Sequence, residues 1–366
     1  MFNPWQQWEE FAAGQRALAA LGRKTLRRER RVVPDRMNPF TAMSDREFTE
    51  QFRLKKESVN DIILKIGDCL PQSTDRRGCR VPPHLQVLLA LAAMASGSHQ
   101  EVIGDYFDVS QTTVSQCLAR VASAIAGLIH QYITFPTGNM LHKVIEDFRA
   151  IAGMPGVVGC IDCTHFQIIK PPRNDSEIFK CKKGYFSLNI QAICGPDLLF
   201  YNIVSRWPGS VDDASIFENS RIHDDLQDGI LPGHLLGDSG YSNRQYLLTP
   251  LLSPNGPHEE RYNASHIQTR NTIDRAFGVL KRRFAYLGKS IRTNLETTKA
   301  IIVASAILHN IAVKTRLNME DDINAVNENL QNNDLNVIEN FVEARYDSDE
   351  VLQGRLKREQ IIREHF

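Results

Sequence analysis

The alternation of apolar and polar positions between residues 157 and 241 predicts a region rich in β-strands. Three apolar segments read as consecutive strands: VVGCIDCTHFQII (157–169), FSLNIQAICG (186–195) and DLLFYNIVSRWPG (197–209). Turns are expected at Pro171 and Pro172 and again at the Gly195-Pro196-Asp197 sequence. A helix is predicted over 212–222, and HLLGDSGY (234–241) then reads as a short buried strand that ends on an aspartate.

Helical periodicity dominates residues 45–132. Ser44 and Glu47 have the spacing of a capping box at the start of this region. One face of a later helix, which Ser110 can cap, carries Val114, Leu118, Val121 and Ile125 at spacings of 4, 3 and 4. With the helix before it, this outlines a helix-turn-helix, although any two-helix corner has a similar pattern. The exposed polar positions that suit DNA bases and phosphates are Gln111, Thr112, Thr113, Ser115 and Gln116.

The last third of the chain returns to helical periodicity. A helix over 270–287 carries the apolar positions Ile273, Phe277, Leu280 and Phe284, a second follows over 297–316, and the end, 352–366, is basic and amphipathic. We therefore predict an α/β fold with an all-α helix-turn-helix domain before it. The expected divisions are a basic, partly disordered arm (1–40), a helical domain (41–140), an α/β domain (141–316), and an acidic segment with a C-terminal helix (317–366).

Composition narrows the class of protein. Hydrophobic residues make up 42% and charged residues 23%, as in soluble globular proteins. The first residues, MFNPWQQWEEF, contain acids and no apolar segment, so we expect no signal peptide. The longest apolar stretches are too short to span a bilayer, so no membrane association is expected. Seven scattered cysteines favour a reducing compartment over a disulfide framework.

The zero formal net charge hides a strong asymmetry along the chain. Residues 1–40 hold eight Lys and Arg against four acids, and residues 270–292 hold seven against one. Residues 317–350 instead hold ten acids against one base. Basic segments of this kind indicate an anionic partner such as DNA, although a solvated helix face gives the same pattern.

Three aspartates interrupt otherwise apolar elements. Asp162 lies within the first strand, Asp238 ends the later strand, and we expect Asp274 on the first turn of the following helix, with 35 residues between it and Asp238. A carboxylate buried without a partner is costly, so such a residue needs an arginine, hydrogen-bond donors or a metal ion. Three carboxylates converging from two strands and a helix would suit two Mg²⁺ or Mn²⁺ ions and phosphodiester chemistry. This layout is that of ribonuclease-H-like DDE/DDD nucleases.

Several longer motifs resemble the PIF/Harbinger transposase family, including the animal nucleases derived from Harbinger transposases. The matching segments are AGMPGVVGCIDCTH, RWPGSVDDASIFENS, LLGDSGY, TPLLSP, RYNASH, IDRAFGVLKRRF and ILHNIA. The resemblance covers roughly residues 45–316 and implies a metal-dependent DNA endonuclease or transposase. Asp162 and Asp238 match the first two catalytic acids of the family. The third is usually glutamate, so Asp274 is a departure; Glu259 and Glu260 are poorer candidates for this role.

The resemblance also implies further residues and partners. Asp213 matches an additional family acid, with a role beside the metal or, alternatively, as a helix N-cap in competition with Asp212. Phosphate contacts are expected from Lys180, Lys182, Lys183, Lys281 and Arg282. The resemblance implies a nuclear protein that works with a Myb/SANT-like DNA-binding partner and shuttles with it from the cytoplasm. It is also compatible with a homo-oligomer.

Two functions remain open at this point. One is a nuclease that cuts DNA and also joins 3′-hydroxyl ends to a target. The other is a domesticated transposase that binds DNA or a partner without transposition. The CIDC sequence is a weak zinc candidate, because Cys160 and Cys163 would point to opposite faces of a strand. His165 is expected to be a packing or hydrogen-bonding residue.

Overall fold

The computed structural model describes residues 38–71, 73–74, 80–172, 174–317, 319–331 and 349–366. The predicted N-terminal arm and most of the acidic segment therefore lie outside the described residues. The chain divides into two compact units, one of residues 1–128 with 284–289 and one of residues 129–283 with 290–366. None of the described helices is long and apolar enough to cross a membrane.

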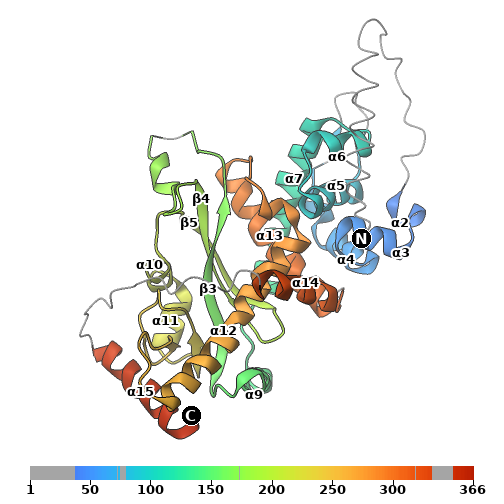
Figure 1. The fold of residues 1–366 in the computed structure, drawn as a ribbon. Coiled ribbons are helices and arrows are strands. Elements are labelled where there is room, and N and C mark those ends of the chain that lie inside the picture. Colours follow the sequence, from blue (N-terminus) through green and yellow to red (C-terminus); the bar gives the residue numbers. More distant parts are fainter. Residues whose placement is uncertain (1–37, 72, 75–79, 173, 318, 332–348) are drawn as a thin grey trace, which may run out of the picture. The chain divides into compact units, whose positions relative to one another are not determined.

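The first unit is almost entirely helical (Figure 1). Its helices are α2 (Pro39–Ala42), α3 (Asp45–Phe52), α4 (Lys56–Ile66), η1 (Gly67–Cys69), α5 (Pro83–Ser96), α6 (Gln100–Tyr106), α7 (Gln111–Ala126) and η3 (Ala285–Gly288), with β1 (Ser73–Thr74) and β2 (Arg80–Val81) as a short antiparallel pair. The predicted capping box is confirmed, since the Glu47 amide donates to Ser44 Oγ and the Ser44 amide donates to Glu47 Oε2. The predicted apolar face of α7 is fully buried.

The turn between α6 and α7 depends on a glycine. A Cβ atom at Gly104 would lie 2.8 Å from the Val109 carbonyl oxygen, so a larger residue would push the two helices apart. Asp108 adopts a φ of 50° in this turn, a conformation that Asp tolerates better than most residues. Ser110 then caps α7 by accepting a hydrogen bond from the Thr113 amide at 3.1 Å. The sequence therefore predicted this two-helix corner correctly.

The second unit is built on a mixed five-stranded sheet in the order β5-β4-β3-β6-β7. Its strands are β3 (Val157–Gln167), β4 (Ser187–Cys194), β5 (Phe200–Pro208), β6 (His234–Leu236) and β7 (Leu247–Leu248). β3, β4 and β5 pair antiparallel, whereas β6 and β7 run parallel to β3. All the predicted strands are present, and the short β7 is an addition to them.

Helices cover both faces of this sheet (Figure 1). The helices of this unit are α8 (Ile129–Tyr132), α9 (Asn139–Ala152), η2 (Ser176–Phe179), α10 (Asp213–Glu218), α11 (Arg221–Gln227), α12 (Pro257–Arg283), α13 (Leu295–Lys314), α14 (Met319–Gln331) and α15 (Asp349–His365). The single helix predicted over 212–222 is in fact two, because Ser220 begins a new helix by capping α11.

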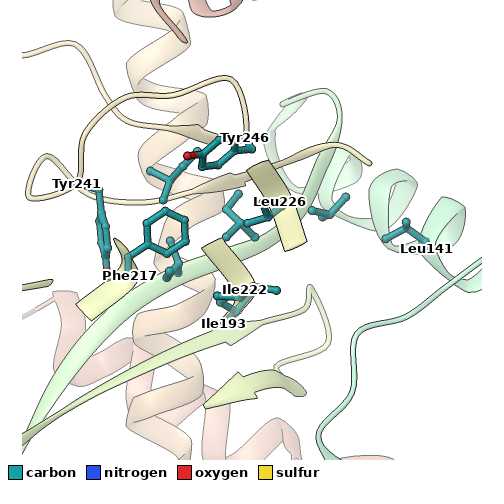
Figure 2. Close-up of a cluster of buried hydrophobic side chains, with 11 residues drawn as sticks. Leu141, Ile193, Phe217, Ile222, Leu226, Tyr241 and Tyr246 are labelled. Carbon is teal, nitrogen blue, oxygen red and sulfur yellow. The ribbon is translucent and has the colours of Figure 1, made fainter. Parts of the chain in front are cut away.

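One sheet face packs on α10 and α11 through a cluster of buried apolar side chains (Figure 2). Ile161 of β3 and Ile193 of β4 meet Phe217 of α10 and Leu226 of α11 in this cluster. The other face of β3 packs on α12, through contacts such as the bond from Cys160 Sγ to the Thr269 carbonyl oxygen at 3.4 Å. β3 is thus buried on both sides, and any polar side chain on it needs a specific partner.

Buried polar side chains complete the backbone bonding of the outer strand β5. The Asn310 amide group of α13 accepts from the Phe200 amide at 2.8 Å and donates to the Phe200 carbonyl oxygen at 2.8 Å. It also donates to the Tyr132 carbonyl oxygen at 2.9 Å. The neighbouring His309 donates through Nε2 to the Leu198 carbonyl oxygen at 2.9 Å. This explains the polar pair in the ILHNIA motif.

Candidate active site

One face of β3 presents polar side chains to α12. Asp162 accepts an ion-pair hydrogen bond from Arg270, and Thr164 Oγ1 accepts a hydrogen bond from Lys281 Nζ at 2.6 Å. Lys281 also lies 5.1 Å from the centroid of the Phe166 ring. Residues two apart on a strand share a face, so the polar row and the aromatic ring follow from the sequence spacing. The contact surface between β3 and α12, called the α12–β3 seam below, therefore contains charged side chains although the core around it is apolar.

The sheet register places Asp238 beside Asp162. Cys160 pairs with Leu236, the last residue of β6, across the parallel strands β3 and β6. Asp238 is the second residue after β6, where the chain turns and its Oδ1 accepts from the Gly240 amide at 2.9 Å. Asp162 lies in the middle of β3, close enough to Asp238 that each carboxylate affects the other.

Arg270 joins Asp162 to the third predicted acid. Its Nη1 lies 3.2 Å from Asp162 Oδ2, and its Nη2 lies 3.1 Å from Asp274 Oδ2. The side chains are 20%, 14% and 30% exposed for Arg270, Asp162 and Asp274. The sequence analysis missed this arginine, although its position four residues before Asp274 on a helix is the spacing of an intrahelical ion pair.

The electrostatics of the site are those of crowded carboxylates around one cation. Burial raises the pKa of the Asp162 carboxyl well above its usual range; Arg270 opposes this, and Asp274 and Asp238 add to it. Burial lowers the pKa of Arg270, but the three carboxylates outweigh burial and raise it overall. Three acids therefore influence one another here, with Arg270 between two of them and Lys281 also interacting with Asp162.

The carboxylate oxygens of this site suit a divalent metal ion, but Arg270 contacts two of the three carboxylates. Within the described residues, no three His, Cys, Asp or Glu side chains form a group that could hold a metal ion. Carboxylate oxygens are nevertheless the ligands that Mg²⁺ and Mn²⁺ prefer, and the clustered negative charge calls for a cation. Asp162, Asp238 and Asp274 therefore fit a divalent metal in the chemistry of their side chains, although as placed here they do not form such a group.

The position of Asp274 along its helix differs from the prediction. α12 begins at Pro257, so Asp274 lies deep in the helix and not on its first turn. Glu259 and Glu260 occupy that first turn. At a rise of 1.5 Å per residue, Glu260 is about 21 Å from Asp274 along the helix axis. These two glutamates therefore cannot replace Asp274 in the site.

Asp213 lies with the opposite face of β3. Its Oδ1 accepts from Asn189 Nδ2 at 2.9 Å, and Asn189 pairs with His165 across the sheet. Burial raises the pKa of the Asp213 carboxyl, against the effect of hydrogen bonds from Asn189 and Cys163. Asp212, and not Asp213, is the N-cap of α10, since it accepts from the Ser215 amide. The structure thus does not bring Asp213 together with Asp162 and Asp274.

The alternation of β3 also decides the CIDC sequence. Cys160 bonds to the α12 backbone, whereas Cys163 Sγ lies 3.4 Å from the Tyr241 hydroxyl on the other side of the strand. The prediction that the two thiols face opposite ways is confirmed. His165 is on the same side as Cys163, with Nδ1 lying 3.0 Å from Ser187 Oγ, as expected for a hydrogen-bonding histidine.

The predicted phosphate-binding residues fall into two groups. Lys180, Lys182 and Lys183 are exposed on the loop between β3 and β4. Burial lowers the pKa of Lys281, and the nearby Lys183 lowers it further, so the loop and the α12–β3 seam share one electrostatic environment. Arg282 instead pairs with Asp322 of α14, its Nε lying 3.2 Å from Oδ1.

The polar positions at the start of α7 are only partly as predicted. Gln111, Thr112, Ser115 and Gln116 are exposed. The expectation for Thr113 is wrong, because this residue is 5% exposed. Its Oγ1 lies 2.9 Å from Ser110 Oγ, so the side chain turns inward to complete the cap.

Comparisons with known proteins give one consistent result. Residues 161–310 match a family model described as DDE superfamily endonuclease. The chain is 32% identical over 277 residues to the Homo sapiens protein named "Putative nuclease HARBI1", covering 74% of this chain and 79% of that protein. The Xenopus laevis protein of the same name is 30% identical over 273 residues, 73% and 78% of the two chains. The Arabidopsis thaliana "Protein ALP1-like" is 26% identical over 300 residues, 77% and 72% of the two chains. No solved structure matches this chain.

Proposed function

The chain belongs to the family of nucleases derived from Harbinger transposases, and we propose that it cuts DNA phosphodiester bonds with Asp162, Asp238 and Asp274 as its catalytic acids. The observation that carries this proposal is the approach of three carboxylates where β6 ends beside the middle of β3, with Arg270 of α12 bridging Asp162 and Asp274. The strand order and directions support a ribonuclease-H-like core, with three antiparallel strands followed by two parallel ones.

The three acids are the residues that would hold two Mg²⁺ or Mn²⁺ ions, which when bound activate the attacking oxygen and stabilise the leaving oxygen. The rigid supports of the acids are what the protein itself contributes. Asp162 is fixed on a central strand with its Oδ1 bonded to the Cys163 amide at 2.7 Å, and Asp274 is fixed by the packing of α12 on that strand. Joining of 3′-hydroxyl ends to target DNA would use the same acids, with a hydroxyl in place of water.

The basic residues around the seam would hold the DNA backbone next to these acids. Lys183 and Lys281 lie close enough to each other to lower the pKa of Lys281, so a phosphate placed between them would relieve a like-charge repulsion. At the start of α7, the exposed Gln111 and Gln116 supply amide groups suited to base edges. We assign these residues to DNA contact on this basis, with α6 and α7 as a helix-turn-helix.

The family membership further suggests where the protein works and with what. A nuclear location and a Myb/SANT-like DNA-binding partner, which would choose the site, follow from the resemblance to Harbinger transposases. The modest set of base-reading candidates on α7 agrees with a shared choice of site. An assembly of two or more copies would allow both ends of an element to be cut together.

One observation favours a second candidate, a DNA- or partner-binding protein that no longer cuts. Arg270 engages two of the three acids, as it would in a site without metal. Nicking of supercoiled plasmid by the full chain decides between the two functions. We expect nicking in Mn²⁺ and none in Ca²⁺ or EDTA, with Asp162→Asn inactive and the exposed Asp147→Asn unaffected. Equal nicking by Asp162→Asn and by the intact chain would contradict the nuclease assignment.

A further inference from the structure

Arg270 occupies the place between the acids that a cation would need. Its two terminal nitrogens contact one oxygen each of Asp162 and Asp274, at 3.2 and 3.1 Å. A planar guanidinium is well suited to such a bridge, because its nitrogens are held in a fixed fork. Asp238 also interacts with Arg270, so all three carboxylates act on this arginine.

The oxygen atoms that Arg270 contacts already carry charge-assisted hydrogen bonds. Asp162 Oδ1 accepts from the Cys163 amide, and Oδ2 accepts from Arg270. Asp274 Oδ2 is occupied in the same way. A divalent ion placed on these atoms would also repel the guanidinium at short range. The arginine and a metal ion therefore compete for the same two carboxylates.

We infer that Arg270 is an internal counter-cation that holds Asp162 and Asp274 together in the metal-free protein and must release them before a divalent metal binds. The inference rests on the proposed function, because it takes these acids as metal ligands. Arg270 is on this account a positioning residue that sets the affinity for metal. Both contacts are made by the Arg270 side chain alone, so rotation of this side chain would release the acids while α12 stays in place.

The test measures metal binding and not cleavage. Mn²⁺ is titrated into the EDTA-treated full chain by isothermal calorimetry, with Arg270→Gln as the variant. Removal of the competing cation is expected to tighten Mn²⁺ binding by about tenfold or more, the scale of effect that groups bonded to metal ligands have. Unchanged or weaker binding by Arg270→Gln would overturn the inference.

A matched control variant separates the effect of the Arg270 contacts with the acids from the effect of removing one positive charge. Arg275 is on the same helix, has the same charge and is near enough to Asp274 that both affect the Cys160 thiol. Its Nη2 bonds to Thr272 Oγ1 at 3.1 Å, within α12 itself. Arg275→Gln should change Mn²⁺ affinity by no more than about twofold, as for a loosely coupled charge. An equal tightening by both variants would show that net charge alone is responsible, and would overturn the inference.

Failure of the inference and failure of the proposed function give different results. Asp162→Asn should abolish Mn²⁺ binding in the Arg270→Gln background; binding that survives lies elsewhere and contradicts both. No binding by any variant also contradicts both. Binding by the unaltered chain that is lost in Asp162→Asn but is no tighter in Arg270→Gln keeps the metal site and removes the inference.

A second variant, Arg270→Lys, provides the test if circular dichroism shows that Arg270→Gln does not fold. Arg270→Lys keeps the charge but cannot form the two-pronged bridge, so it should tighten Mn²⁺ binding by a smaller factor, about threefold. Binding as weak as in the unaltered chain, or weaker, would overturn the inference in that case.

Discussion

Asp274→Asn separates the proposed chemistry from the stability of the fold. The change keeps the size of the side chain and removes its charge. The fold loses the ion pair with Arg270, at 3.1 Å between side chains that are 20% and 30% exposed. Pairs of this kind on a helix contribute about 0.5 kcal/mol, so the free energy of unfolding should fall by less than about 1 kcal/mol.

The expected loss of activity is much larger. Asp274 would complete the ligand set of one metal ion, and losing it should slow strand cleavage by about 10²-fold or more, which corresponds to about 2.7 kcal/mol of transition-state stabilisation. Nicking of supercoiled plasmid in Mn²⁺ measures the rate of strand cleavage, and urea unfolding measures the stability of the fold. DNA binding in Ca²⁺ should persist, because the expected phosphate contacts come from lysine and arginine side chains.

Asp274→Glu tests how the site is shaped. The added methylene extends the carboxyl group by about 1.5 Å, one C–C bond. Because Asp274 already reaches Arg270 from its place on α12, a longer side chain should crowd the metal position and lower activity. An increase would instead indicate a site shaped for glutamate. Full nicking activity in a folded Asp274→Asn variant would refute the reasoning and remove Asp274 from the site.

Three further predictions concern the fold and DNA binding. Asn310→Ala leaves the buried backbone groups of Phe200 without partners and should lower the free energy of unfolding by about 2–4 kcal/mol in urea titrations; a loss below about 1 kcal/mol would contradict this. Burial lowers the pKa of His309 to about 3, so its contribution to stability is present above about pH 6.5 and is lost as the pH falls toward 3. His309→Gln should therefore make unfolding between pH 6 and 4 less pH-dependent by about one proton, measured by urea titrations across this range; an unchanged slope would argue against a buried neutral histidine. Lys183→Gln should reduce the slope of log affinity against log salt for duplex DNA by about one, and an unchanged slope would remove Lys183 from the interface.

The elements with strong periodicity were predictable from the sequence, and so were two of the acids. β3, β4 and β5 follow apolar runs bounded by proline and glycine, and Ser110 fixes the start of α7. The approach of Asp238 to Asp162 follows once Asp162 is placed within β3 and Asp238 just after the neighbouring parallel strand β6. Local patterns of hydrophobicity and turn residues were sufficient for these features.

The start of α12 could not be read from hydrophobicity, because its first half is buried through polar side chains. Tyr262 donates to the Thr249 carbonyl oxygen, Ser265 to that of Ala152, and His266 to that of Leu248. These partners are distant in the sequence, so the segment looks like a polar loop. Because the first half of α12 was not predicted, Asp274 was placed at the start of a helix.

Arg270 was missed for a related reason. Its spacing from Asp274 is visible in the sequence, but the bridge to Asp162 exists only because α12 packs on β3. The prediction that Thr113 is exposed failed for a similar reason, because it depends on a contact that the sequence pattern does not show. A capping serine can recruit a neighbouring hydroxyl inward, and the alternation of polar residues does not reveal it.

The most direct test of the central claim is a crystal structure of the full chain grown with Mn²⁺, with the ions located by anomalous scattering. The account predicts a peak within about 2.1 Å of carboxylate oxygens of Asp162 and Asp238, with Asp274 completing the site and Arg270 withdrawn from it. Peaks found only elsewhere, or any of the three carboxylates more than about 8 Å from the other two, would contradict it, since paired ions of this kind lie about 4 Å apart.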